Sequence, residues 1–107
     1  MAAKPATALE LLSDPTKWIK GSYAHDKDGH LVSPSRPEAC SWCLEGALVA
    51  VYGYGGMLDR ESTVAAALPE EIMREWTVGS KRLVPFFNDH PKTTHAMVLE
   101  VLQKAGL

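Results

Sequence analysis

The two cysteines form a C-x-x-C motif, Cys40-Ser41-Trp42-Cys43, the spacing at which one thiolate attacks a disulfide and the second resolves the product. Redox motifs of this kind normally follow a β-strand in an alternating strand and helix pattern, and no such strand precedes Pro37. Free cysteine is among the most buried residue types, so we interpret this motif as reduced core cysteine. A reducing compartment explains free thiols, which predicts a cytoplasmic protein.

A zinc site is an alternative interpretation of the same cysteines. His25 and His30 precede them in an H-x4-H-x9-C-x2-C pattern, and imidazole and thiolate groups are the ligands that zinc prefers. The order is the reverse of the common zinc finger, and the two histidines flank an acidic turn. A zinc-stabilised fold therefore stays an alternative, and the main expectation is a protein without metal or cofactor.

The acidic turn itself, Asp26-Lys27-Asp28-Gly29, resembles the middle of a calcium-binding loop, in which oxygen ligands alternate before a glycine. In that register the first and twelfth positions are Ala24 and Ser35, and neither carries a carboxylate. The segment is therefore interpreted as a plain turn.

A cysteine-dependent enzyme would need a thiol, a histidine base and an orienting Asn or Asp. Cys43, His90 or His95, and Asn88 or Asp89 are the right residue types. Asn88-Asp89 also has a structural interpretation, because Asn and Asp side chains cap helix N-termini and a helix is predicted just after them. We keep the enzyme as an alternative and expect no catalytic function.

The elements that must position these residues are mostly helical. Apolar spacing and capping signals predict helices over residues 5–12, 15–20, 38–52 and 59–67, a fifth from Pro69, and a last one over 91–105. Residues 22–33 lose the helical period and predict a small hairpin or ordered loop, while residues 81–87 contain Pro85 and predict an extended connector.

The predicted helix over residues 38–52 carries a stripe of small residues, Ala39, Cys43, Gly46 and Ala50, at helical spacing. Glycine inside a helix costs about 1 kcal/mol relative to alanine, and a closely approaching backbone would compensate for that cost. We therefore expect this helix at the centre of the fold, packed tightly against another segment.

Composition limits the classes of protein. The chain has 107 residues and a net charge of −2 from 11 basic and 13 acidic residues, with no block of like charge. This size predicts a single helical domain over residues 1–107. A nucleic-acid interface needs clustered basic residues and a membrane helix needs about 20 apolar residues, so we expect neither partner.

The order of several motifs resembles a bacterial family of small domains of unknown function. These motifs are Trp18, the run from Gly21 to Asp26, the run from Trp42 to Leu48, Phe87-Asn88-Asp89, and a last helix led by Thr94. Phe87 stands where the family usually has tryptophan, and Cys40 lies outside the family pattern. The resemblance implies a shared fold and no assigned activity, and it points to Cys43, Asn88 and Asp89 as one cluster.

We therefore predict a mainly α protein, a compact bundle of about five helices with a small β-hairpin or ordered loop between the second and third. The expected function is non-enzymatic: a protein–protein interaction or small-ligand binding module, with a protein partner or a second copy in a homodimer. The candidate binding residues are Tyr23, Asp26, Trp42, Cys43, Asn88 and Asp89.

Overall fold

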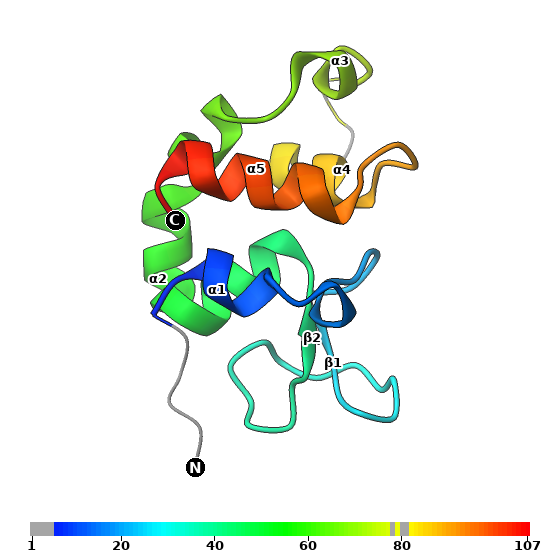
Figure 1. The fold of residues 1–107 in the computed structure, drawn as a ribbon, viewed down its shortest axis with the longest axis vertical. Coiled ribbons are helices and arrows are strands. Elements are labelled where there is room, and N and C mark those ends of the chain that lie inside the picture. Colours follow the sequence, from blue (N-terminus) through cyan, green and yellow to red (C-terminus); the bar gives the residue numbers. More distant parts are fainter. Residues whose placement is uncertain (1–5, 78, 80–81) are drawn as a thin grey trace.

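The computed structural model describes residues 6–77, 79 and 82–107 (Figure 1). It contains the helices α1 (Ala8–Leu12), α2 (Leu44–Ala66), α3 (Glu70–Met73), α4 (Leu83–Asp89) and α5 (His95–Ala105), the 3-10 turn η1 (Pro15–Lys17), and the strands β1 (Ala24–His25) and β2 (Ser41–Trp42). The predicted mainly α fold with a small antiparallel pair is confirmed. The predicted helix start at Pro5 and the first connector residue, Lys81, lie outside the described residues.

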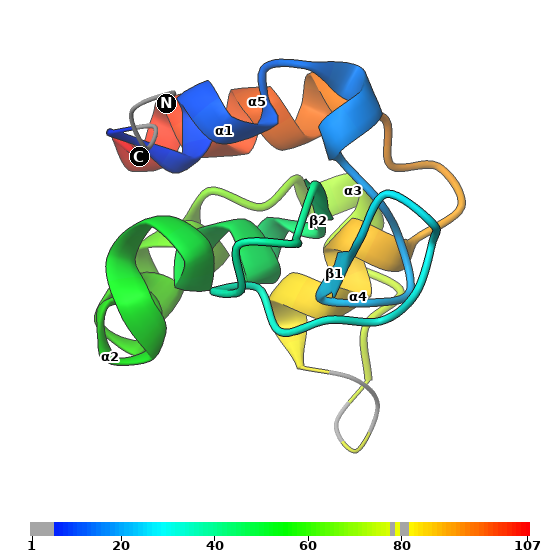
Figure 2. The same cartoon turned by 90° about the horizontal axis from the view of Figure 1, so that it is seen from below.

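The helices form two layers. Figure 2 shows α1 and α5 side by side in one layer, with α2 and α4 in the other and the two strands at one end. The hydroxyl of Tyr52 joins the layers: it accepts from the backbone N of Ala8 at 3.3 Å and donates to the carbonyl of Leu107 at 3.1 Å. Within the described residues, no helix combines the length and apolar character needed to cross a bilayer.

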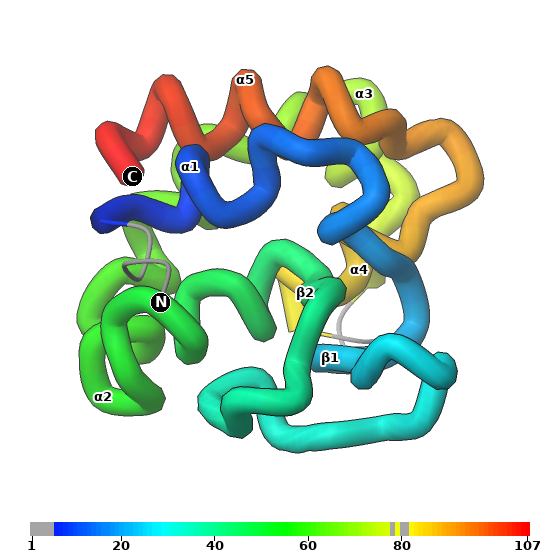
Figure 3. Tube along the Cα trace, turned by 60° about the horizontal axis from the view of Figure 1, so that its bottom comes forward, coloured from blue at the N-terminus to red at the C-terminus, as the bar shows by residue number. Residues whose placement is uncertain are grey.

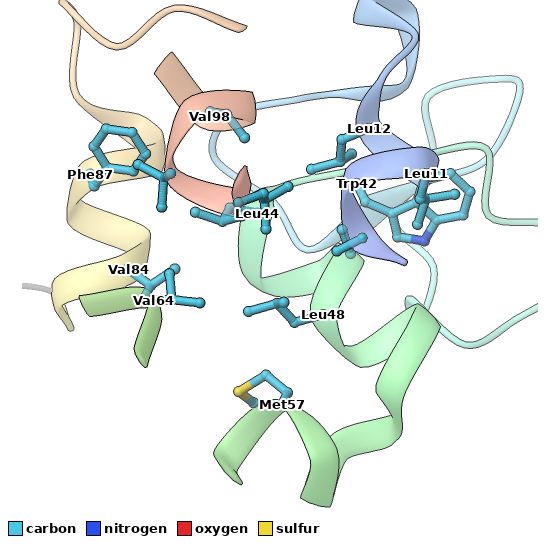
Figure 4. Packing of buried hydrophobic residues seen from close by; sticks show 14 of the residues in the cluster. Leu11, Leu12, Trp42, Leu44, Leu48, Met57, Val64, Val84, Phe87 and Val98 are labelled. Atoms are coloured by element: carbon cyan, nitrogen blue, oxygen red, sulfur yellow. The ribbon is translucent and has the colours of Figure 1, made fainter. Parts of the chain in front are cut away.

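The core lies between the layers. In Figure 4, Leu44 of α2 lies between Leu12 of α1 and Phe87 of α4, and all three side chains are completely buried. Full burial of one large apolar side chain contributes about 2 kcal/mol. The labelled core residues of Figure 4 are Leu11, Leu12, Trp42, Leu44, Leu48, Met57, Val64, Val84, Phe87 and Val98.

The central helix differs from its predicted bounds. It begins at Leu44 instead of Glu38, because Ser41 and Trp42 are extended and pair with His25 and Ala24 in the antiparallel sheet. It also continues past the predicted end at residue 52. Gly53 has φ of +78°, a conformation that glycine adopts without strain, so α2 changes direction there and runs on to Ala66 (Figure 3).

An extended connector was predicted over residues 81–87, but residues 83–87 belong to helix α4. Pro85 is the third residue of α4, where a backbone N–H has no helical acceptor and proline is therefore tolerated. Asn88 and Asp89 were predicted to cap the last helix. They lie inside α4 instead, so this prediction is wrong. That role belongs to Thr94, whose hydroxyl accepts from the backbone N of Met97 at 3.3 Å.

Candidate functional site

A pocket of about 310 Å³ lies where three segments meet: the stretch that enters β1, the start of α2, and α4. Figure 2 shows β1 beside α4. We call it the Arg82 pocket; its described lining is Gly21, Ser22, Tyr23, Cys43, Arg82, Pro85 and Asp89. The surface is predominantly apolar with a few polar groups, as is typical of small-molecule sites.

Asn88 holds the walls of this pocket together from behind. Its side-chain oxygen accepts from the indole N–H of Trp18 at 2.6 Å and from the backbone N of Leu44 at 3.0 Å. Its amide nitrogen donates to the carbonyl of Ile19 and to Oδ1 of Asp89, both at 3.0 Å. A neutral amide group can make about four such bonds, so this completely buried side chain is saturated.

Asp89 extends the same network to the pocket wall. Its Oδ1 accepts from the backbone N of Gly21 at 2.8 Å as well as from Asn88. The stretch from Ile19 to Gly21 is therefore fixed to α4 at two points. This attachment places Ser22 and Tyr23 beside the start of α2, where they line the pocket.

The start of α2 approaches the backbone of Tyr23 very closely. Cys43 donates its backbone N–H to the carbonyl of Tyr23 at 3.2 Å, and a Cβ on Gly46 would lie 2.0 Å from that carbonyl oxygen. Only glycine fits there. The predicted close packing along the small-residue stripe is confirmed at this position. The segment that packs against the helix is the stretch that enters β1.

Cys43 was predicted inside a helix, but it is the N-cap of α2. Its Sγ accepts from the backbone N of Gly46 at 3.2 Å. A helix N-terminus usually favours a thiolate, yet burial dominates here and raises the pKa of the Cys43 thiol to about 11. The group that Cys43 presents to the pocket at neutral pH is therefore an uncharged thiol.

Arg82, the N-cap residue of α4, joins two carboxylates from the two halves of α2. Its Nη2 lies 2.5 Å from Oε1 of Glu45 and also contacts Oε1 of Glu61. The kink at Gly53 allows one guanidinium to reach both halves of the helix. Arg82 is half exposed, whereas the Glu45 side chain is only 1% exposed.

Glu45 is an unusual buried group. In the described part of the chain, neither carboxylate oxygen has a hydrogen bond of regular geometry, although Oε1 forms the ion pair with Arg82. Burial raises the pKa of the Glu45 carboxyl, with Arg82 acting in the opposite direction and Glu61 adding to the rise. The pKa of Tyr23 is also raised, first by burial and then by the nearby Glu45.

The structure brings three of the six predicted binding residues to one pocket. Tyr23, Cys43 and Asp89 line it, and Asn88 lies behind them. Trp42 is buried away from this lining and donates its indole N–H to the carbonyl of Pro34 at 3.0 Å. Asp26 lies in the turn, where its Oδ1 accepts from the backbone N of Asp28 and of His30, each at 2.9 Å.

The cysteine-enzyme alternative lacks its base. Among the described lining residues of the Arg82 pocket there is no histidine. Nε2 of His90 lies 3.1 Å from Oε1 of Glu75, and Nε2 of His95 lies 2.5 Å from the carbonyl of Leu12. Cys43 and Asp89 therefore meet without the third member of a catalytic set.

The four predicted zinc ligands do not converge either. Cys40 is exposed, Cys43 is buried, and both are free thiols. Across residues 6–77, 79 and 82–107, the one group of three or more suitable ligand atoms is Asp26, Asp28 and His30. The described structure therefore does not bring His25, His30, Cys40 and Cys43 together as one set of zinc ligands.

Reasoning from the sequence missed the charged part of the site. Glu45 had a detectable signal, because it is the single charge in the otherwise apolar or small run from Trp42 to Ala50. Arg82 and Glu61 had none: each is an ordinary surface residue in the sequence, and their contact depends on the kink at Gly53.

Comparison with known proteins places the chain in a family without assigned function. No curated protein and no solved structure matches it. The model of a family of unknown function, DUF6197, matches residues 5–106. That match includes every residue of the Arg82 pocket and nearly the whole chain, so the protein belongs to the DUF6197 family.

Proposed function

We propose that the domain binds a small organic molecule in the Arg82 pocket. The observation that carries this proposal is the pocket itself, whose volume of about 310 Å³ is at the lower end of the range for small-molecule sites. Apolar surface supplies most of such a ligand's binding energy, and the few polar groups orient it. Tyr23 and Pro85 provide apolar surface, and Ser22, Arg82 and Asp89 provide polar groups.

The attachment of the walls supports the same proposal. The hydrogen bonds of Asn88 and Asp89 fix the Ile19–Gly21 stretch before any ligand arrives. A pre-formed site binds more tightly because less conformational entropy is lost on binding. The pocket therefore has the rigidity that a binding module needs.

The experiment is a thermal-shift screen of a small-metabolite collection, with native mass spectrometry to confirm that each hit binds with defined stoichiometry. Ser22 is half buried in the pocket wall, so Ser22→Trp fills the pocket and should abolish the shift. Ser33→Trp, at an exposed loop position outside the lining, is the matched control and should retain it. Equal shifts in both folded variants would refute binding in this pocket.

The protein-interaction module and the homodimer remain predictions. The large apolar side chains that the structure leaves exposed are Tyr23, Leu31, Tyr54, Leu58 and Leu83. Singly exposed apolar residues are normal on a protein surface. A sedimentation-velocity experiment distinguishes a monomer from a dimer directly.

A further inference from the structure

The guanidinium of Arg82 has donors to offer a ligand. Its Nη2 serves both carboxylates, Glu45 and Glu61. In the part of the chain that the structure describes, no acceptor is bound to its Nε–H or to its Nη1 group. Arginine carries five N–H donors in a rigid planar fork, so three of them are available at the pocket that Arg82 lines.

The charge of Arg82 is already compensated. One cation faces two carboxylates, so the Arg82, Glu45 and Glu61 group has a net charge of −1 when both acids are ionised, and zero when Glu45 is protonated. In neither state is there a net positive charge for an anion. An incoming carboxylate or phosphate would lose its hydration and meet the two glutamates.

The rest of the described lining adds no positive charge near Arg82, and Asp89 adds a carboxylate, whose Oδ1 accepts from the backbone N of Gly21 and from the amide of Asn88. Cys43 presents a thiol, Pro85 is apolar, and Tyr23 is half exposed with an aromatic face that suits stacking on a planar group. A planar ligand could stack on Tyr23 and place one acceptor against Arg82. The pocket thus combines N–H donors with an electrostatic preference against negative charge.

We infer that the Arg82 pocket selects an uncharged planar ligand, of the aromatic amide or heterocyclic carbonyl class, whose oxygen accepts from the free N–H groups of Arg82. This inference rests on the proposed function and adds the chemical class of the ligand. Glu45 and Glu61 determine that class by cancelling the charge of Arg82 while leaving its donors unused.

The test compares two probes of nearly the same shape, benzamide and benzoate, by ¹H–¹⁵N NMR titration at pH 7.5 and low salt. Benzamide should shift the backbone amides of Ser22 and Tyr23 and bind at least about fivefold more tightly than benzoate. Tighter binding of benzoate would overturn the inference.

Two variants test the roles of the charges. Glu61→Gln removes one compensating carboxylate and should move the benzamide-to-benzoate preference toward benzoate by about three- to fivefold. Glu100→Gln changes the net charge of the protein equally, but Glu100 pairs with Lys104 on α5 outside the pocket, so the preference should not move. An equal change in both variants would show a general charge effect and refute the inference.

Arg82→Lys tests the planar donors. Lysine keeps the positive charge beside Glu45, so the fold should be retained, while benzamide binding should weaken about tenfold because the fork of N–H groups is lost. Unchanged benzamide binding in this variant would contradict a role for the guanidinium. If neutral ligands found in the thermal-shift screen bind elsewhere and charged ones bind here, only the ligand class is wrong. If no ligand of any charge binds here, the proposed function itself fails.

Discussion

Two buried polar side chains at the start of α2 have opposite hydrogen bonding: Asn88 of α4, which accepts from the backbone N of Leu44, and Glu45, the second residue of α2. Asn88 is completely buried and makes four hydrogen bonds, two of which reach the Trp18–Ile19 segment. Glu45 is 1% exposed, and its carboxylate has an ion pair with Arg82 but no hydrogen bond of regular geometry in the described structure. One group is saturated and the other is not.

The difference separates architecture from function. A saturated buried amide stabilises one arrangement of the chain, because every alternative leaves its partners unpaired. An incompletely satisfied buried carboxylate is costly, and in folded proteins such exceptions concentrate at functional sites. We therefore assign Asn88 to the construction of the Arg82 pocket and Glu45 to its electrostatic character.

The largest expected effect is the loss of Asn88. Asn88→Ala leaves the Leu44 N–H, the Trp18 indole and the Ile19 carbonyl without partners, so the free energy of unfolding should fall by about 4 kcal/mol. Gln103→Ala, at an exposed position of α5, is the control and should change it by less than about 0.5 kcal/mol. Urea unfolding of both variants measures the difference. A small decrease for Asn88→Ala would mean that the hydrogen bonds of Asn88 do not stabilise this arrangement of the chain.

The next effect concerns the thiols near that helix start. Cys43 has a pKa of about 11 against a usual value near 9.0, so its thiolate fraction at neutral pH is about 100-fold lower than usual. Cys40 is exposed. In the folded protein, iodoacetamide should therefore modify Cys40 at least about 100-fold faster than Cys43, as measured by peptide mass spectrometry over time. Comparable rates for the two cysteines would show that the buried Cys43 becomes accessible to the reagent readily.

Substitution of Gly46, which packs against the backbone of Tyr23, should have a smaller effect on stability. In Gly46→Ala the new methyl group would overlap the carbonyl oxygen of Tyr23, and relief of that overlap should cost about 2 kcal/mol. Gly55→Ala is the matched control in the same helix, because a methyl group there meets no neighbour within 4 Å. It should stabilise the protein by up to about 1 kcal/mol. Effects of the same sign in thermal unfolding would contradict the close approach.

These positions also show what the sequence could reveal. Local signals were sufficient for the end of α5, where Gly106 is the predicted stop, and for the close approach at Gly46. The start of α5 was predicted at residue 91, whereas the helix begins at His95 after its N-cap Thr94. The start of α2 was misplaced because the pairing of Ser41 and Trp42 with β1 is a contact between distant residues. The role of Asn88 was hidden for the same reason, since three of its four partners lie 44 to 70 positions away in the chain.

The smallest expected effect is that of Glu45→Gln. The variant should be as stable as the wild type at pH 7 or up to about 1 kcal/mol more stable, because Arg82 is half exposed and keeps Glu61 as its partner. Burial raises the pKa of Glu45 above its usual value of 4.5. The folded state therefore binds this proton more tightly than the unfolded state does, and the resulting stability is complete below pH 4.5 and is lost as the pH rises through the raised pKa.

Urea unfolding of the wild type and Glu45→Gln between pH 4 and 8 measures that loss. The stability of the variant relative to the wild type should increase as the pH rises from 4.5. A relative stability that stays constant across this range would mean that Glu45 ionises normally and that its burial has no electrostatic consequence.

The most direct test of the central claim is a crystallographic soak with a fragment collection, because the molecule offers a second cavity of similar size. That cavity, of about 340 Å³, lies between the end of α2 and α5 and is lined by Pro69, Glu71 and Met97 among others. Its described lining contains neither Glu45 nor Arg82, the residue that connects Glu45 to the first pocket. Uncharged planar fragments are expected in the Arg82 pocket, with an oxygen on the guanidinium of Arg82. Fragments that occupy only the second cavity would contradict the claim that the incompletely satisfied Glu45 marks the binding site.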